Sequence, residues 1–132
     1  MITAYFDASA ILKLTLAERE SLALIDYLNE RDVRVATSVI AEVEVTRTLL
    51  RMRVDQEERD GALRRIYLLS LDSDVRGEAT RIKPHQLRSL DAIHVATAMS
   101  IGEGNLEFIT YDDRMADAAR AAGLKVVQPG RC

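Results

Sequence analysis

Short apolar segments alternate with longer helical segments along the whole chain, and this alternation restricts the possible folds more than any other feature. Runs of apolar and β-branched residues, typical of buried strands, occupy residues 2–6, 33–36, 106–110 and 124–127. Helical spacing of apolar residues, or a high alanine content, predicts helices over residues 8–16, 20–31, 39–52, 55–69, 72–81, 90–102 and 112–122. Strands that alternate with helices form parallel sheets with helices on both faces. We therefore predict an α/β fold with a parallel, twisted sheet of about four to five strands.

Residues that favour helix ends mark several of these boundaries. Ser38, Asp55 and Ser89 each stand where a helix is predicted to begin, and their side chains can accept a hydrogen bond from a free backbone N–H. Gly123 follows the alanine-rich helix, where glycine commonly adopts the left-handed conformation that ends a helix. Pro84 indicates a loop between two of the predicted helices.

Length and composition indicate one globular domain over residues 1–132, since domains commonly have about 100–200 residues. Hydrophobic residues make up 48% and charged residues 30%, which excludes general disorder. The lone cysteine, Cys132, is the last residue, so an intrachain disulfide and a cysteine-based zinc site are excluded. We find neither a signal peptide nor an apolar run of about 18 residues that could span a membrane. We therefore expect a cytoplasmic protein without a membrane partner.

Charge is distributed unevenly along the chain, although its net value is only −3. Residues 45–90 carry ten Lys or Arg and seven Asp or Glu, a balance of +3, whereas the segments on both sides are acidic. A positive middle permits a local phosphate-binding face. A solvated helical surface explains the same charge pattern equally well.

Acidic residues follow two of the predicted strands. Asp7 comes directly after residues 2–6, and Asp112 and Asp113 come shortly after residues 106–110. The carboxyl ends of parallel strands lie at one edge of the sheet, where α/β proteins bind their ligands. We therefore expect these acids to meet at that edge.

Three further acids lie in predicted helices among apolar neighbours. Asp91 stands near the start of its helix. Because its neighbours in that helix are apolar, we do not expect its carboxylate to be fully solvated. Glu42 and Glu44 are two residues apart, about 200° around a helix, so at most one should face a common site and spacing alone does not choose between them. His94 follows Asp91 by three residues on the same helix face, where it could assist the site, although we favour a hydrogen-bonded position in the core or at its rim.

Carboxylates that converge repel one another, so one must stay protonated or a cation must neutralise them. A hard divalent ion such as Mg²⁺ or Mn²⁺ suits a site made only of carboxylate oxygens. One such ion, or a pair, can activate water and stabilise charge on a phosphoryl group, which points to phosphodiester hydrolysis. The same acids can also be explained without a metal. Asp7, Asp112 or Asp113 could cap a helix, and Asp91 could interact with a helix dipole. The spacing of the residues leaves both explanations open.

Four sequence blocks occur in the order found in one nuclease family. They are Tyr-Phe-Asp-Ala-Ser-Ala at residues 5–10, the segment 37–47 with its serine, glutamate and arginine, Leu-Arg-Ser-Leu-Asp-Ala-Ile-His-Val-Ala-Thr-Ala at residues 87–98, and Phe-Ile-Thr-Tyr-Asp at residues 108–112. Together they cover essentially the whole chain, and the third block is the most specific. On these blocks the chain resembles the PIN-domain nucleases and is most similar to the VapC-type toxins of toxin–antitoxin pairs.

The resemblance implies a metal site and assigns its residues. The catalytic and metal-binding acids would be Asp7, Glu44, Asp91 and Asp112, with Asp113 as a further or water-mediated ligand and with one or two Mg²⁺ or Mn²⁺ ions. Ser9 and Thr110 would orient these ligands through hydrogen bonds. The family pattern prefers Glu44 to Glu42 because Glu44 lies six residues after Ser38 and three before Arg47.

The resemblance also implies a fold, an activity and partners. Similar toxins have a three-layer PIN-like fold, hydrolyse RNA phosphodiester bonds as metal-dependent endoribonucleases, commonly form homodimers and are held inactive by a small cognate antitoxin. An acidic site cannot attract RNA unaided, so basic side chains must contact the phosphates. The candidates nearest to the motifs are Arg47, Arg51, Arg88 and Arg114, and the basic middle of the chain adds Arg53, Arg64 and Arg65.

Other functions stay open on the sequence. A phosphoacceptor receiver domain also has an α/β sheet and an acidic magnesium pocket, but it carries paired acids after its first strand and a late lysine. Here Asp7 stands alone, and Lys125 follows Gly123 rather than a strand end. A non-catalytic PIN-like module would bind RNA or a partner without turnover. The helices at 20–31 and 55–69 have apolar and charged faces, and one could present a groove to an antitoxin helix or a second copy of the chain.

Overall fold

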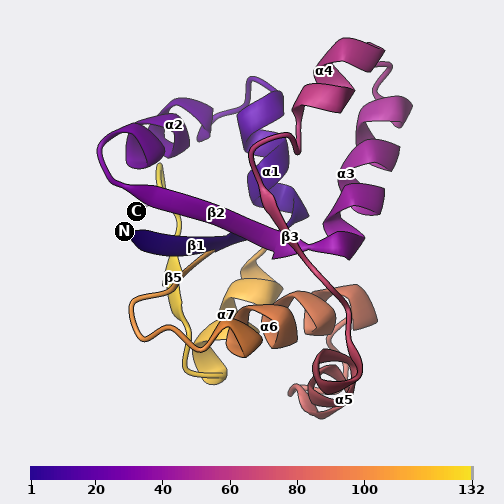
Figure 1. Cartoon of the computed structure of the whole chain (residues 1–132), viewed down its shortest axis with the longest axis vertical. Helices are drawn as coiled ribbons and strands as arrows, with labels where there is room; N and C mark the ends of the chain where they lie inside the picture. The colour runs from indigo at the N-terminus through magenta and orange to yellow at the C-terminus, as the bar shows by residue number, and fades with distance from the viewer. Residues whose placement is uncertain (132) are drawn as a thin grey trace.

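The computed structural model describes residues 1–131, and Cys132 lies outside the described residues. Within this range the chain forms five strands and seven helices (Figure 1). In chain order they are β1 (Ile2–Phe6), α1 (Ala8–Thr15), α2 (Ser21–Asn29), β2 (Val33–Ser38), α3 (Val39–Arg51), α4 (Gln56–Gly61), β3 (Tyr67–Leu69), α5 (Ser73–Arg81), α6 (Ser89–Ile101), β4 (Glu107–Ile109), α7 (Asp113–Ala121) and β5 (Lys125–Val127). None of the helices in this range is long and apolar enough to cross a membrane.

The strands form one parallel sheet in the order β3-β2-β1-β4-β5, with β1 at its centre. The pairing of β1 runs from Ile2–Val33 to Tyr5–Ala36 on one side, and β4 pairs with the other side. From β1 the chain moves outward to β2 and β3, and it then crosses to β4 on the opposite side of β1. The connections that follow β1 and β4 therefore diverge, and the carboxyl ends of two such strands are the usual ligand-binding position in α/β sheets.

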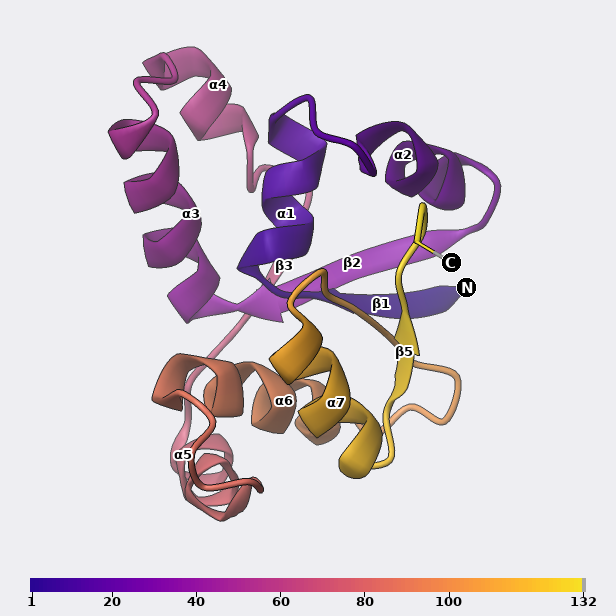
Figure 2. The same cartoon turned by 180° about the vertical axis from the view of Figure 1, so that it is seen from behind.

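Helices cover both faces of the sheet. Figures 1 and 2 show α1 to α4 on one face and α5 to α7 on the other. Alternate residues of β1 point to opposite faces, so Ala4 and Phe6 pack into the apolar cluster under α1 to α3, whereas Tyr5 packs with Phe108 into the cluster of α5 to α7. This arrangement is a three-layer α/β fold with a five-stranded parallel sheet in the described range, and it confirms the predicted fold class.

Several predicted helix ends are confirmed. The side chain of Ser38 accepts a hydrogen bond from the Ile40 N–H at the start of α3, and Asp55 accepts one from the Glu58 N–H at the start of α4. Gly123, which follows α7, has a φ of +89°, a conformation that glycine adopts at little cost.

The predicted helix over residues 55–69 is wrong in its second half. Helix α4 ends at Gly61, and Tyr67–Leu69 form β3, whose partners in β2 are Ala36, Thr37 and Ser38. Strand β3 has only three residues and lies at the edge of the sheet. Its side chains are exposed or partly buried, so its sequence lacks the apolar pattern of a buried strand. A short apolar run of this kind fits a strand or a helix equally well, and pairing with β2 decides between them.

Two smaller boundaries also differ from the prediction. Strand β2 continues to Ser38 rather than ending at residue 36, because its last residues pair with β3. Helix α6 begins at Ser89, and its N-cap residue is Arg88, which makes no capping hydrogen bond with its side chain. Ser89 is therefore not the N-cap. The Arg88 side chain is used elsewhere, in contacts with two carboxylates.

The orientation of α3 can be tested with neighbouring leucines. Leu49 is fully buried beside Ala41 and Val45, whereas Leu50 is exposed. We predict that Leu49→Ala lowers the free energy of unfolding by about 2–5 kcal/mol, because it leaves a cavity in the core. Leu50→Ala should change it by about 0.5 kcal/mol or less. Urea denaturation measures both values, and equal losses would show that α3 is rotated from the described orientation.

Candidate active site

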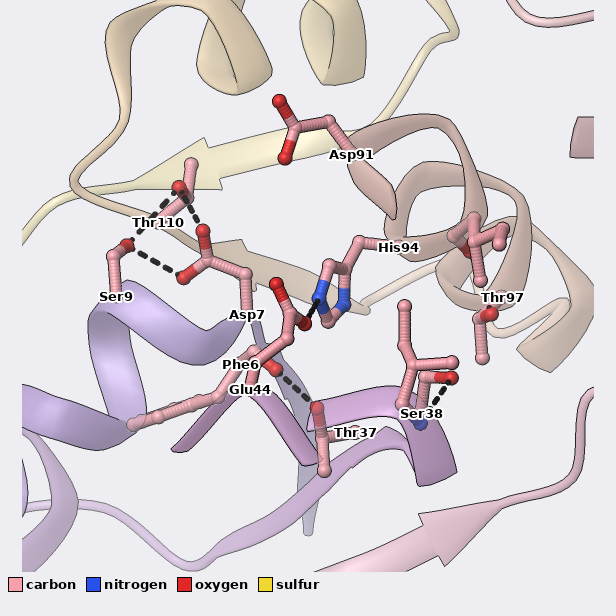
Figure 3. A network of polar contacts seen from close by, with 12 residues as sticks. Phe6, Asp7, Ser9, Thr37, Ser38, Glu44, Asp91, His94, Thr97 and Thr110 are labelled. Carbon is pink, nitrogen blue, oxygen red and sulfur yellow. Dashed lines mark hydrogen bonds and ion pairs between the residues drawn. The ribbon is translucent and has the colours of Figure 1, made fainter. Parts of the chain in front are cut away.

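Four acids converge from different parts of the chain at the carboxyl edge of the sheet, and we call them the acid edge. They are Asp7 after β1, Glu44 on α3, Asp91 in the first turn of α6 and Asp112 after β4. The Asp7 N–H donates to the Ile109 carbonyl at 3.2 Å, which holds the ends of β1 and β4 together. Figure 3 shows Asp7, Glu44 and Asp91 turned toward the same region from three different elements.

Asp7 is the most buried member of the acid edge, with only 2% of its surface exposed. Its Oδ1 accepts hydrogen bonds from the Ser9 hydroxyl at 2.7 Å and the Ala10 N–H at 2.9 Å, and its Oδ2 accepts one from the Thr110 hydroxyl at 2.6 Å. Burial nevertheless raises the pKa of Asp7, because desolvation outweighs these hydrogen bonds. The ionised carboxylate therefore favours a nearby cation.

Ser9 and Thr110 also connect the two strand ends to each other. Their hydroxyl oxygens lie 3.4 Å apart, and Ser9 Oγ accepts a hydrogen bond from the Tyr111 N–H at 3.0 Å. Thr110 Oγ1 accepts one from the Asp112 N–H at 3.1 Å. These contacts fix the backbone on both sides of the Asp7 carboxylate.

Arg88 lies between two members of the acid edge. Its Nε donates to Asp91 Oδ2 at 3.1 Å and its Nη2 donates to Asp112 Oδ2 at 3.2 Å, although 69% of the side chain is exposed. Asp91 is 5% exposed, so its carboxylate is buried except toward this edge. One guanidinium thus forms ion pairs with two carboxylates and offsets part of their negative charge.

Asp112 and Asp113 have different surroundings. Asp112 Oδ1 accepts hydrogen bonds from the Arg114 and Met115 N–H groups, so this residue both caps α7 and belongs to the acid edge. The Asp113 side chain is 87% exposed and pairs with Arg131 Nη1 at 2.9 Å. The structure therefore brings Asp112 to the other acids and gives Asp113 a separate partner.

The fold distinguishes the two glutamates of α3. Glu42 is exposed, whereas Glu44 is partly buried and its Oε1 lies 2.7 Å from His94 Nε2. His94 is fully buried, as expected for a core residue, but it also contacts the acid edge. Sequence reasoning missed this contact, although the three-residue spacing of Asp91 and His94 was a signal that both residues share one face of α6.

A cleft of about 220 Å³ opens beside these residues, lined by Glu44, Arg88, Ser89, Leu90 and Asp91. A larger cleft of about 470 Å³ lies between α5 and α6, but its lining contains no carboxylate. The smaller cleft is the one that gives access to the acid edge. Its lining combines carboxylates with an arginine, a combination suited to a cation and a phosphate together.

The acid edge fits a hard divalent cation by the chemistry of its donors, which are all carboxylate oxygens. Across residues 1–131 no group of three or more His, Cys, Asp or Glu side chains is arranged to hold one ion. Two contacts explain this arrangement, since Arg88 binds Asp91 and Asp112, and His94 binds Glu44. A divalent ion would have to compete with Arg88 for these carboxylates.

Comparison with known proteins gives consistent matches over the whole chain. The PIN domain family model matches residues 4–121. Ribonuclease VapC46 of Mycobacterium tuberculosis is 44% identical over 131 residues, covering 98% of this chain and 99% of that protein. Ribonuclease VapC35 of the same species is 37% identical, covering 96% of this chain and 97% of that protein.

Solved structures agree with the sequence matches. A toxin–antitoxin complex from Klebsiella pneumoniae has a chain 26% identical to this one, with a TM-score of 0.72 and coverage of 94% of this chain and 95% of that chain. Mycobacterium tuberculosis VapC20, described as a toxin that cleaves the sarcin–ricin loop, has a TM-score of 0.73 at 18% identity, covering 96% of this chain and 99% of that chain. The second match supports the fold alone.

The burial of Asp7 predicts an unusual effect on stability. Because burial raises the folded-state pKa of Asp7 above its unfolded value, ionisation destabilises the fold as the pH rises through the folded-state pKa. We predict that Asp7→Asn makes the protein more stable than the wild type at neutral pH in EDTA, and that the difference shrinks as the pH falls. Urea denaturation at several pH values measures the difference in the free energy of unfolding between the two proteins.

The control is Asp113→Asn, which removes an exposed acid and should change the free energy of unfolding little. An Asp7→Asn protein less stable than the wild type at neutral pH would contradict the prediction.

Proposed function

This chain belongs to the PIN-domain family, and we propose that it is a divalent-metal-dependent endoribonuclease of the VapC type that a cognate antitoxin holds inactive. The convergence of Asp7, Glu44, Asp91 and Asp112 at the carboxyl edge of the sheet carries this proposal. The VapC ribonucleases that match this chain do so over nearly their full length, so the proposal concerns the whole chain.

In this proposal the four acids hold one or two Mg²⁺ or Mn²⁺ ions. Such an ion supplies positive charge to the phosphoryl oxygens and makes water more acidic, which is the chemistry that hydrolysis of a phosphodiester requires. Ser9 and Thr110 keep the Asp7 carboxylate in place through their hydrogen bonds. Arg88, released from Asp91 and Asp112 when a metal binds, would lie where it could contact a substrate phosphate.

The proposed substrate is RNA, and exposed arginines close in sequence to members of the acid edge would bind its phosphates. Arg47 and Arg51 lie on α3 beyond Glu44, and Arg114 is in the first turn of α7. All three are exposed and so can reach a ligand. Their charge would offset the repulsion between the acid edge and the RNA backbone.

The proposed protein partners are an antitoxin and a second copy of the chain. A cleft of about 670 Å³ lies between α1, α2, β2 and the segment that includes α4, and its lining combines apolar residues with Glu58, Arg64 and Arg65. A cleft that offers both apolar and charged side chains would suit an amphipathic helix of an antitoxin. For the homodimer, the exposed Val43 and Leu50 on α3 offer apolar surface.

The proposal is tested by cleavage of total cellular RNA with the purified protein free of antitoxin. We predict discrete fragments with Mg²⁺ or Mn²⁺ and none with EDTA. Glu44→Gln should lower the rate by orders of magnitude, because it removes a charged ligand from the acid edge. Glu42→Gln is the matched control on the exposed side of the same helix and should cleave like the wild type. Cleavage that survives Glu44→Gln would show that the site is assigned wrongly, and a folded, metal-binding protein without cleavage would indicate a binding module.

The role of the arginines is tested separately by RNA binding. We measure the affinity of an Asp91→Asn protein for a single-stranded RNA at increasing salt, and we predict a steep loss of affinity. Adding Arg47→Gln should lower the slope of the logarithmic salt dependence by about 1, because one phosphate contact is lost. Arg34→Gln is the control, since Arg34 lies near the amino end of β2 and pairs with Glu103. A slope unchanged by Arg47→Gln would exclude this residue from the RNA interface.

A further inference from the structure

His94 connects the sheet core to the acid edge through two short hydrogen bonds. The residue is fully buried on α6, and its ring lies edge-on to Tyr5, with the ring centroids 5.7 Å apart. Tyr5 Oη lies 2.6 Å from His94 Nδ1, and Glu44 Oε1 lies 2.7 Å from His94 Nε2. Both ring nitrogens are therefore engaged, one by Tyr5 in the core and one by the proposed metal ligand Glu44, and Figure 3 shows the contact with Glu44.

The partners of Tyr5 set the direction of these hydrogen bonds. The Ser38 N–H donates to Tyr5 Oη at 3.2 Å, so the tyrosine oxygen already acts as an acceptor. With Tyr5 Oη already accepting from Ser38, its own O–H is free to donate to His94 Nδ1, 2.6 Å away. With Nδ1 as the acceptor, the matching tautomer of His94 carries its ring proton on Nε2 and donates it to Glu44 Oε1.

We propose that His94 is a positioning residue for Glu44, held as the Nε2–H tautomer by Tyr5 so that Glu44 presents its carboxylate to a divalent cation. The inference rests on the proposed function and adds a residue to its site. Helices α3 and α6 lie on opposite faces of the sheet, so the Glu44–His94 bond joins the two helical layers at the carboxyl edge. A donor on Oε1 restrains the long glutamate side chain and leaves its second oxygen for the cation.

Packing alone does not account for this arrangement. Val95 and Ala98, neighbours of His94 on α6, fill the same core with apolar side chains. Tyr5 hydrogen-bonds to one ring nitrogen of His94, and the other ring nitrogen hydrogen-bonds to Glu44. Without Glu44, the second nitrogen would lose this partner. Side chains that hydrogen-bond to a metal ligand commonly contribute about 10–100-fold to metal affinity or activity.

Two substitutions at this position separate positioning from packing. The side-chain amide of His94→Asn can occupy the place of Nδ1 and so meet Tyr5, but it is too short to reach Glu44. The longer amide of His94→Gln can occupy the place of Nε2 and donate to Glu44. We expect His94→Asn to bind Mn²⁺ about 10–100-fold more weakly than the wild type in a calorimetric titration. His94→Gln should restore most of the affinity, and thermal unfolding without metal checks that both variants are folded.

The tautomer is measured on the wild type, so the inference stays testable even if both variants fail to fold. Imidazole ¹⁵N NMR shifts of the metal-free protein should show that His94 carries its proton on Nε2 and none on Nδ1. Tyr5→Phe should increase the fraction of His94 that has its proton on Nδ1. A wild type with the proton on Nδ1, or a folded His94→Asn protein that binds Mn²⁺ like the wild type, would overturn the inference and leave the proposed ribonuclease intact. A wild type that neither binds Mn²⁺ nor cleaves RNA would overturn both.

Discussion

Carboxylates brought together at one edge of a parallel sheet repel one another, and the contacts around this edge offset that repulsion. The Ser9 and Thr110 hydroxyls and a backbone N–H stabilise the buried Asp7 carboxylate. A single guanidinium, from Arg88, lies between Asp91 and Asp112. These donors lower the cost of bringing the acids together, yet the pKa of Asp7 stays raised. Under the proposed function, a divalent cation would offset the charge that remains.

The topology of the sheet explains why the acids meet. Strands β1 and β4 are neighbours with diverging connections, so their following residues, Asp7 and the segment leading to Asp112, lie at the same edge. Helices α3 and α6 deliver Glu44 and Asp91 from the two faces of the sheet. Asp7 and Asp112 are at the same time the N-caps of α1 and α7. Asp7 and Asp112 therefore combine helix capping with a position at the acid edge, so capping does not argue against their proposed role in the site.

The sequence predicts the fold and most of the acid edge because both depend on local patterns. Alternating strands and helices predict the parallel sheet, and an acid directly after a strand predicts the position of Asp7. The edge strand β3 was missed because its three residues are only partly buried and its pairing with β2 defines it. The contact between Glu44 and His94 joins residues 50 positions apart, and Arg88 reaches Asp112 across 24 positions. Such long-range contacts depend on the packing of helices across the sheet, which no local pattern encodes.

The central claim is that the acid edge holds a divalent cation, and anomalous X-ray scattering from crystals of the protein grown with Mn²⁺ tests it most directly. We predict anomalous density from one or two ions bound by the carboxylates of the acid edge (Asp7, Glu44, Asp91 and Asp112), with Arg88 displaced from Asp91 and Asp112. A map without a peak at this edge at saturating Mn²⁺, with Arg88 still between the two aspartates, would contradict it.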